Sequence, residues 1–126
     1  MTLLTDRDNF RLKGVHVDLV RVVERAIKST DFMVLEGVRT KELQALYVAR
    51  GASQTMFSRH ITGHAVDLVP LINGQISWAW PSYFPMAKVI KEAAVTENVK
   101  IVWGGDWVSF KDGPHFELDR KFYPGA

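Results

Sequence analysis

The absence of cysteine from all 126 residues is the feature that most limits how this chain can fold. It excludes disulfides, thiolate nucleophiles, iron–sulfur clusters and zinc sites built from cysteine. The fold must therefore be held by an apolar core, and a chain of this length with 47% hydrophobic residues can form one as a single domain. Any bound metal must use His, Asp or Glu, and the only histidines are His16, His60, His64 and His115.

The charge pattern argues against two classes of partner. The net charge is only +2 and no run of like charge occurs, so we expect no nucleic-acid partner. The amino-terminal segment MTLLTDRDNFRLKG lacks the apolar stretch of a signal peptide, and no apolar run approaches the length of a membrane span. We therefore expect no stable membrane association, and export only with outside help.

Hydrophobic periodicity indicates both helices and strands. Helical spacing predicts helices over residues 17–29, 40–50 and 83–97, and β-prone runs predict strands over residues 32–36, 65–70, 100–103 and 115–118. Thr40 is a predicted N-cap, Gly51 a helix stop, Asn73-Gly74 a turn and Pro70 a strand end. Because regular βαβ alternation is absent, we predict an α+β single domain with a small antiparallel sheet and helices packed on one side.

The stretch SRHITGHAVDL gathers two histidines and an aspartate. His60 and His64 have the spacing of a helical zinc motif, but Gly63 and the strand-like run after it argue against a helix. His60 with Asp67 is the preferred metal-binding pair, because an extended backbone turns Asp67 away from the apolar face of Val66. From spacing alone, a surface hydrogen-bonding role for these residues remains the alternative.

A second acidic residue and histidine are separated by a Gly-Pro turn. Asp112 precedes His115 by three positions. A catalytic zinc needs three protein ligands, an open position and a nearby carboxylate that accepts a proton. His60, Asp67 and His115 are the predicted ligands, and Asp112 is the predicted general base. The alternative for Asp112 is a turn-forming role before glycine.

Several motifs together resemble a known family. They are Ser-x-His-x-x-Gly-x-Ala-x-Asp at 58–67, Asp-x-x-His at 112–115, Gly-x-Arg-Thr at 37–40, Trp-Gly-Gly-Asp-Trp at 103–107 and Pro-His-Phe-Glu at 114–117. This set is similar to the D-alanyl-D-alanine carboxypeptidase-like zinc peptidases, which share a metal site with lysostaphin-type enzymes and the hedgehog domain. Within that group it most resembles small phage endolysins that are L-alanyl-D-glutamate endopeptidases.

The resemblance implies a role for each matching residue. His60, Asp67 and His115 would bind one catalytic zinc ion, and Asp112 would act as general base and then as acid. Many relatives have Glu at the position of Asp112, so the carboxylate here is one methylene shorter. Arg39 would stabilise the oxyanion that forms on the substrate carbonyl.

Arg39 and Ser58 carry further expectations. For Arg39 the alternative is an ion pair with Glu36 or Glu42. Ser58 is expected to orient a neighbouring metal ligand through a hydrogen bond, in support of the site.

Substrate contacts are expected from Arg59, Trp103 and Trp107. For the two tryptophans the alternative is burial in the core. His64 is expected to support the site or to face solvent, and His16 to have a structural role.

The resemblance predicts a phage endolysin that hydrolyses the L-alanyl-D-glutamate bond of bacterial peptidoglycan and lyses the host cell. We expect residues 1–126 to form one zinc-peptidase domain, monomeric and without a separate wall-binding module. It would reach the wall from the host cytoplasm by a holin-type route. The alternatives are a D-alanyl-D-alanine carboxypeptidase or dipeptidase, and a non-catalytic zinc-stabilised wall-binding domain.

Overall fold

The sheet is organised around β2 (Ala65–Ile72), which has an antiparallel neighbour on each side. The structure is a computed structural model in which residues 3–53 and 58–125 are described. The strand order is β1-β2-β5-β4, and β3 pairs with the carboxyl end of β2. The other strands are β1 (Phe32–Glu36), β3 (Gln75–Ile76), β4 (Ile101–Trp103) and β5 (His115–Leu118).

Side chains alternate between two faces along the paired strands β2 and β5. Val66 lies opposite Phe116 in the register, and both are fully buried in the hydrophobic core. The neighbouring pair, Asp67 and His115, points to the other face. The same two strands therefore build the core on one side and a polar cluster on the other.

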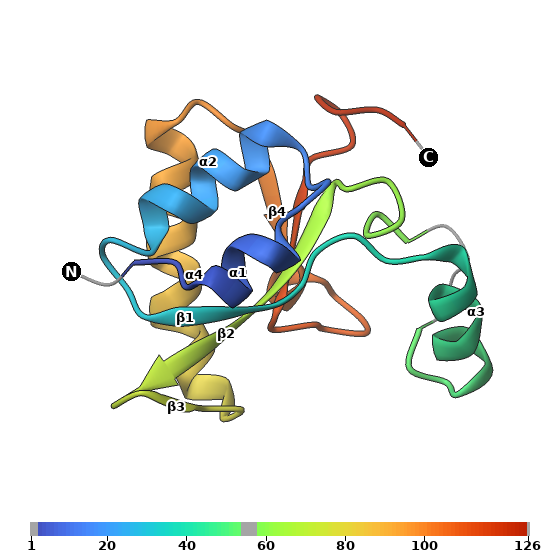
Figure 1. Ribbon diagram of the computed structural model, residues 1–126, viewed down its shortest axis with the longest axis horizontal. Helices are drawn as coiled ribbons and strands as arrows, with labels where there is room; N and C mark the ends of the chain where they lie inside the picture. The colour runs from blue at the N-terminus through green and yellow to red at the C-terminus, as the bar shows by residue number, and fades with distance from the viewer. Residues whose placement is uncertain (1–2, 54–57, 126) are drawn as a thin grey trace.

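Two helices form the layer that covers the apolar face. The helices are α1 (Asp6–Arg11), α2 (Val17–Ala26), α3 (Lys41–Ala49) and α4 (Trp80–Thr96). Figure 1 shows α2 lying across α4, and α4 contacts β2 and β4. The predicted α+β domain with an antiparallel sheet and a helical layer is therefore confirmed. Within residues 3–53 and 58–125, no helix has the length and apolar character needed to cross a membrane.

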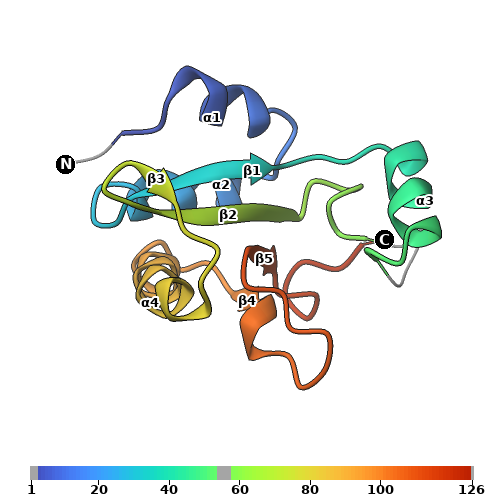
Figure 2. The ribbon, with the colours of Figure 1, turned by 90° about the horizontal axis from the view of Figure 1, so that it is seen from below.

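The other two helices lie at the margins. Figure 2 shows α1 beside the edge strand β1, and α3 beyond the ends of the strands. The sequence analysis did not predict α1, although Thr5 and Asp8 form a capping box at its start. Helix α3 begins after the N-cap Thr40, as predicted, and Gly51 follows its end with a φ of 75°.

Three predicted boundaries are wrong. Helix α2 ends at Ala26 rather than at residue 29, because the N–H groups of Lys28 and Ser29 donate to carbonyls three residues back instead of four. Strand β2 continues past Pro70 because this residue pairs with Phe32 at the start of β1, and its carbonyl accepts a hydrogen bond from the Ser77 N–H. Only the proline's missing N–H is lost from the ladder. Helix α4 begins at Trp80, earlier than predicted, because Pro81 lies in the first turn, where a helix does not need the N–H.

Candidate active site

The three predicted metal ligands meet at one end of the β2–β5 pair. Asp67 comes from β2, His115 from β5, and His60 from the turn that precedes β2. One ligand atom from each lies within 4.8 Å of the others. Asp67 Oδ1 is 3.1 Å from His60 Nε2 and 3.4 Å from His115 Nδ1. His60 and His115, which are far apart in the sequence, thus converge on one carboxylate oxygen.

Acceptors outside the cluster orient both imidazoles. His60 Nδ1 lies 2.8 Å from the Gly37 carbonyl oxygen, and His115 Nε2 lies 2.8 Å from Glu117 Oε1. A ring nitrogen that donates to such an acceptor leaves the other nitrogen with its lone pair. The nitrogens left for a metal, His60 Nε2 and His115 Nδ1, are therefore the two that face Asp67.

The electrostatics of the cluster suit a cation. Burial alone would raise the pKa of Asp67, but hydrogen bonds from His115 and His60 outweigh burial and hold that pKa well below its ordinary range. Burial lowers the pKa of His115, whereas its bonds to Asp67 and Glu117 raise it, and the net effect raises the pKa of His115 to about 9. A metal that bound here at neutral pH would displace the proton on His115. Two imidazoles and one carboxylate match the ligand set of a catalytic zinc site.

Asp112 lines the same cavity, which has a volume of about 260 Å³. Its backbone N–H donates to the Gly104 carbonyl oxygen at 3.0 Å, and a side chain at Gly104 would collide with the backbone of Asp112. Burial, and then the charge of Asp67, raise the pKa of the Asp112 carboxyl. Among residues 3–53 and 58–125 its carboxylate has no hydrogen-bond partner. The turn before β5 is closed by the backbone instead, because the His115 N–H donates to the Asp112 carbonyl oxygen at 3.3 Å.

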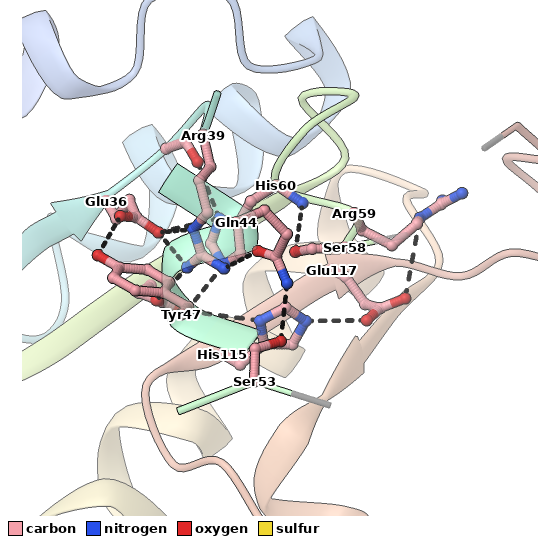
Figure 3. A network of polar contacts seen from close by, with 12 residues as sticks. Glu36, Arg39, Gln44, Tyr47, Ser53, Ser58, Arg59, His60, His115 and Glu117 are labelled. Carbon is pink, nitrogen blue, oxygen red and sulfur yellow. Dashed lines mark hydrogen bonds and ion pairs between the residues drawn. The ribbon is translucent and has the colours of Figure 1, made fainter. Parts of the chain in front are cut away.

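Arg39 is held at the cavity by a network that Figure 3 shows. Its Nε donates to Glu36 Oε1 at 2.7 Å, and its Nη1 donates to Gln44 Oε1 at 2.6 Å. Tyr47 donates to the second Glu36 oxygen at 3.3 Å, and its ring lies 4.6 Å from the guanidinium carbon. The guanidinium also reaches within 3.8 Å of Asp67 Oδ2. Arg39 therefore forms the ion pair with Glu36 and also lines the cavity.

A family model described as phage L-alanyl-D-glutamate peptidase matches residues 2–126. The chain belongs to this family. The match confirms the resemblance predicted from the motifs around the five site residues.

Individual relatives carry the same description. The L-alanyl-D-glutamate peptidase of Escherichia phage T5 is 33% identical over 122 residues, which cover 92% of this chain and 88% of that protein. The L-alanyl-D-glutamate peptidase of Listeria phage A118 is 38% identical over 93 residues, which cover 74% of this chain but only 32% of that protein. This chain thus spans about a third of the longer relative.

A solved structure matches the fold. The crystal structure of the Serratia marcescens L-Ala D-Glu endopeptidase ChiX superposes with a TM-score of 0.92 at 44% sequence identity. The match covers 97% of this chain and 93% of ChiX.

Arg59 does not line the cavity that holds Asp112 and the predicted metal ligands, which corrects the expectation that it contacts substrate. Its side chain is buried, with 2% of the residue exposed. The guanidinium donates to the backbone carbonyls of Leu118, Tyr123 and Gly125 at 3.1, 2.8 and 2.9 Å. Arg59 therefore ties the carboxy-terminal segment to the turn that carries His60.

The two tryptophans differ in position. Trp103 is 4% exposed, stacks on Phe116 and donates its indole N–H to the Gly113 carbonyl oxygen at 2.7 Å. It belongs to the core, which corrects its predicted substrate contact. Trp107 lines the cavity, and its ring centroid lies 5.1 Å from that of His115.

The remaining predicted positions lie around the cluster. Ser58 lines the cavity, and its Oγ accepts a hydrogen bond from the His60 backbone N–H at 3.2 Å. His64 is half-buried, and its Nδ1 lies 2.6 Å from Thr62 Oγ1 rather than at the ligand cluster. His16 caps the start of α2.

Sequence analysis missed three residues that position the site, namely Gln44, Tyr47 and Glu117. The signal for Glu117 was present, because a residue two positions after His115 on a strand points to the same face. Gln44 and Tyr47 are three apart on α3, but nothing in the sequence indicated which face of that helix turns toward Arg39.

Proposed function

We propose that this chain is a zinc-dependent peptidase that hydrolyses the L-alanyl-D-glutamate bond in the stem peptides of bacterial peptidoglycan. The observation that carries the proposal is the cavity in which His60, Asp67 and His115 converge beside Asp112 and Arg39. The bond is taken from the names of relatives that match most of this chain.

His60 Nε2, Asp67 and His115 Nδ1 would hold the zinc ion. When bound, zinc supplies a Lewis acid that polarises a carbonyl and makes water a better nucleophile near neutral pH. The hydrogen bonds that His115 donates to Glu117 and that His60 donates to the Gly37 carbonyl hold the two rings in the orientation that the metal requires.

Asp112 moves the proton in the proposed reaction. Its carboxylate accepts a proton as water adds to the carbonyl carbon of L-alanine. It then delivers this proton to the D-glutamate nitrogen as the C–N bond breaks, which leaves a free amine and a free carboxylate. The raised pKa of Asp112 suits both steps, because the protonated acid is less costly in this buried position than at an exposed aspartate.

Arg39 supports the oxygen that becomes negative. Its guanidinium is fixed by Glu36 and Gln44, so it is positioned before the substrate binds. A preorganised donor at such an oxygen stabilises the transition state by about 3–4 kcal/mol. Trp107 adds a flat apolar wall to the cavity, and Ser58 positions the backbone of His60.

We extend the proposal to the biological setting. The chain acts as a phage endolysin and as a monomer, with residues 1–126 working as one zinc-peptidase domain. It reaches the host wall from the cytoplasm by a holin-type route. The phage relatives support the endolysin role, and sedimentation of the purified protein would test the monomer.

Metal analysis combined with mass spectrometry of digested Gram-negative peptidoglycan tests the enzymatic proposal. We expect bound zinc, new fragments cut after L-alanine, and loss of both in a chelator. Release of single D-alanine residues would instead support a carboxypeptidase. Unchanged wall lysis after Asp112→Ala, with zinc still bound, would contradict the role of Asp112.

A further inference from the structure

The catalytic cavity continues into a second pocket, here called the outer pocket. Ala52, Trp107 and Asp112 line both spaces. The outer pocket has a volume of about 490 Å³, and its other lining residues are Gly51, Ser53, Ser109, Phe110 and Lys111. Because Asp112 faces both spaces, a peptide whose scissile bond lies at Asp112 extends into the outer pocket on one side of that bond.

The loop formed by residues 107–112 is closed at its base. The backbone N–H groups of Trp107 and Asp112 both donate to the Gly104 carbonyl oxygen, at 3.2 and 3.0 Å. Between them, Phe110 has a φ of 55°, in the left-handed region that is unfavourable for a bulky residue. Strain of this kind is retained where the surrounding structure imposes it, often at functional sites. The loop therefore holds Lys111 beside the proposed base.

Lys111 brings a positive charge to the outer pocket that is not neutralised by an ion pair. It is the only cation among the described residues that line this pocket. Its Nζ makes one long contact, 3.4 Å to the Gly105 carbonyl oxygen, and no carboxylate in residues 3–53 or 58–125 lies within ion-pair distance of it. Arg39, on the catalytic cavity, is by contrast already paired with Glu36.

We propose that the outer pocket binds the residue after the scissile bond, and that Lys111 pairs with the free α-carboxylate of D-glutamate. The inference rests on the proposed function. D-Glutamate continues the stem peptide through its side-chain carboxyl, so its α-carboxylate is free on the carbon bonded to the scissile nitrogen. This is the nearest substrate carboxylate to Asp112, and Lys111 is the neighbour of Asp112 in the chain.

The pairing would make Lys111 a specificity-determining residue. A stem peptide whose α-carboxylate is converted to the amide keeps the scissile bond but loses the negative charge. The carboxylate of diaminopimelate lies further along the peptide and is the competing source of negative charge. Peptides that differ at only one of these two groups distinguish the sources.

The test compares the metal-loaded full chain with its Lys111→Met variant on three stem peptides. One has the free D-glutamate α-carboxylate, one has the α-amide, and one has lysine in place of diaminopimelate. We expect the wild type to cleave the free acid with a kcat/KM about tenfold above that for the amide, as a charge-assisted contact provides. Lys111→Met should abolish this preference, because KM for the free acid rises to that for the amide.

Two further variants serve as controls. Lys111→Arg keeps the charge and should keep the preference, whereas Lys88→Met removes an exposed lysine of α4 that lines neither space and should behave as wild type. A preference that persists in Lys111→Met, or that follows the diaminopimelate carboxylate, would overturn the inference. Equal cleavage of acid and amide by the wild type overturns the Lys111 assignment alone, while cleavage of neither peptide overturns the proposed function as well.

Discussion

The two faces of the β2–β5 strand pair have opposite chemistry although they share one backbone. On one face Val66, Leu68 and Phe116 are completely buried in the apolar core. On the other face Asp67 and His115 lie opposite each other beside the cavity. The apolar face is stabilised by removal of its surface from water, whereas each polar side chain needs a specific partner to offset the loss of hydration.

This difference separates stability from chemistry. Apolar packing depends on the volume that is filled more than on which apolar side chain fills it. The site depends instead on individual hydrogen bonds, such as those of His115 with Glu117 and of Arg39 with Glu36. Substitutions on the apolar face should therefore change the free energy of unfolding, and substitutions around the cavity should change turnover.

Asp112→Asn should lower kcat by about 10³-fold, because the variant loses the group that carries the proton. Asparagine has nearly the same shape, so zinc content and the unfolding temperature should not fall. The measurement is steady-state cleavage of a stem peptide together with metal analysis. Near-normal turnover in a zinc-loaded Asp112→Asn protein would mean that another group is the base.

Arg39→Ala should lower kcat by about 10²–10³-fold through loss of the donor at the oxyanion. Arg59→Ala is the comparison variant, because Arg59 is also buried but donates to backbone carbonyls outside the cavity. Since Arg59 Nε also lies 3.9 Å from Oε2 of Glu117, the partner of His115, we expect Arg59→Ala to lower the unfolding temperature and to lower the kcat of the folded fraction far less than Arg39→Ala does. If Arg39→Ala unfolds the protein while the remaining folded molecules keep full activity, its role is structural.

Leu68→Ala should lower the free energy of unfolding by about 3 kcal/mol, because it opens a cavity in the hydrophobic core. Leu68 adjoins the proposed metal ligand Asp67 in the chain but points to the other face. Chemical denaturation measures the loss, and turnover at low temperature should stay within about twofold of wild type if the faces are independent. A large fall in kcat would show that the faces are coupled.

Removal of the metal should destabilise the protein as well as stop the reaction. Binding to the folded state alone contributes about 2.7 kcal/mol when free metal exceeds its dissociation constant a hundredfold. Thermal unfolding with and without a chelator measures this difference. In His60→Ala, which lacks one ligand, the chelator should have little effect, and an equal shift in both proteins would place the metal elsewhere.

The smallest expected effect is on how the stability of the metal-free protein depends on pH. Since burial raises the pKa of Asp112 in the folded state, the folded protein binds this proton more tightly than the unfolded chain does. The resulting stabilisation is present at low pH and is lost as pH rises from the ordinary aspartate value of 3.8 through the raised pKa. Relative to Asp112→Asn, the chelated wild type should therefore lose stability over that interval. Chemical denaturation of both proteins at a series of pH values measures this loss. If the free energies of unfolding of the two proteins change with pH in parallel, the folded state does not raise the pKa of Asp112.

Much of the fold could be predicted because local rules and tertiary packing agree. The alternation in β2 and β5, the N-cap at Thr40 and the Asn73-Gly74 turn with positive φ all act over a few residues. Pro70 was misjudged because its tolerance depends on what pairs opposite it, which is a property of β1.

The family and the residue types at the cavity can be predicted from the sequence, since ligand chemistry requires histidine and carboxylate at fixed spacings. Which of two arginines and which of two tryptophans face that cavity depends on how distant segments pack. Arg59 was assigned to substrate from its position next to His60, yet its partners lie at Leu118, Tyr123 and Gly125. Such a pairing between distant segments leaves no local pattern, because it arises only when the carboxy-terminal segment packs over the turn before β2.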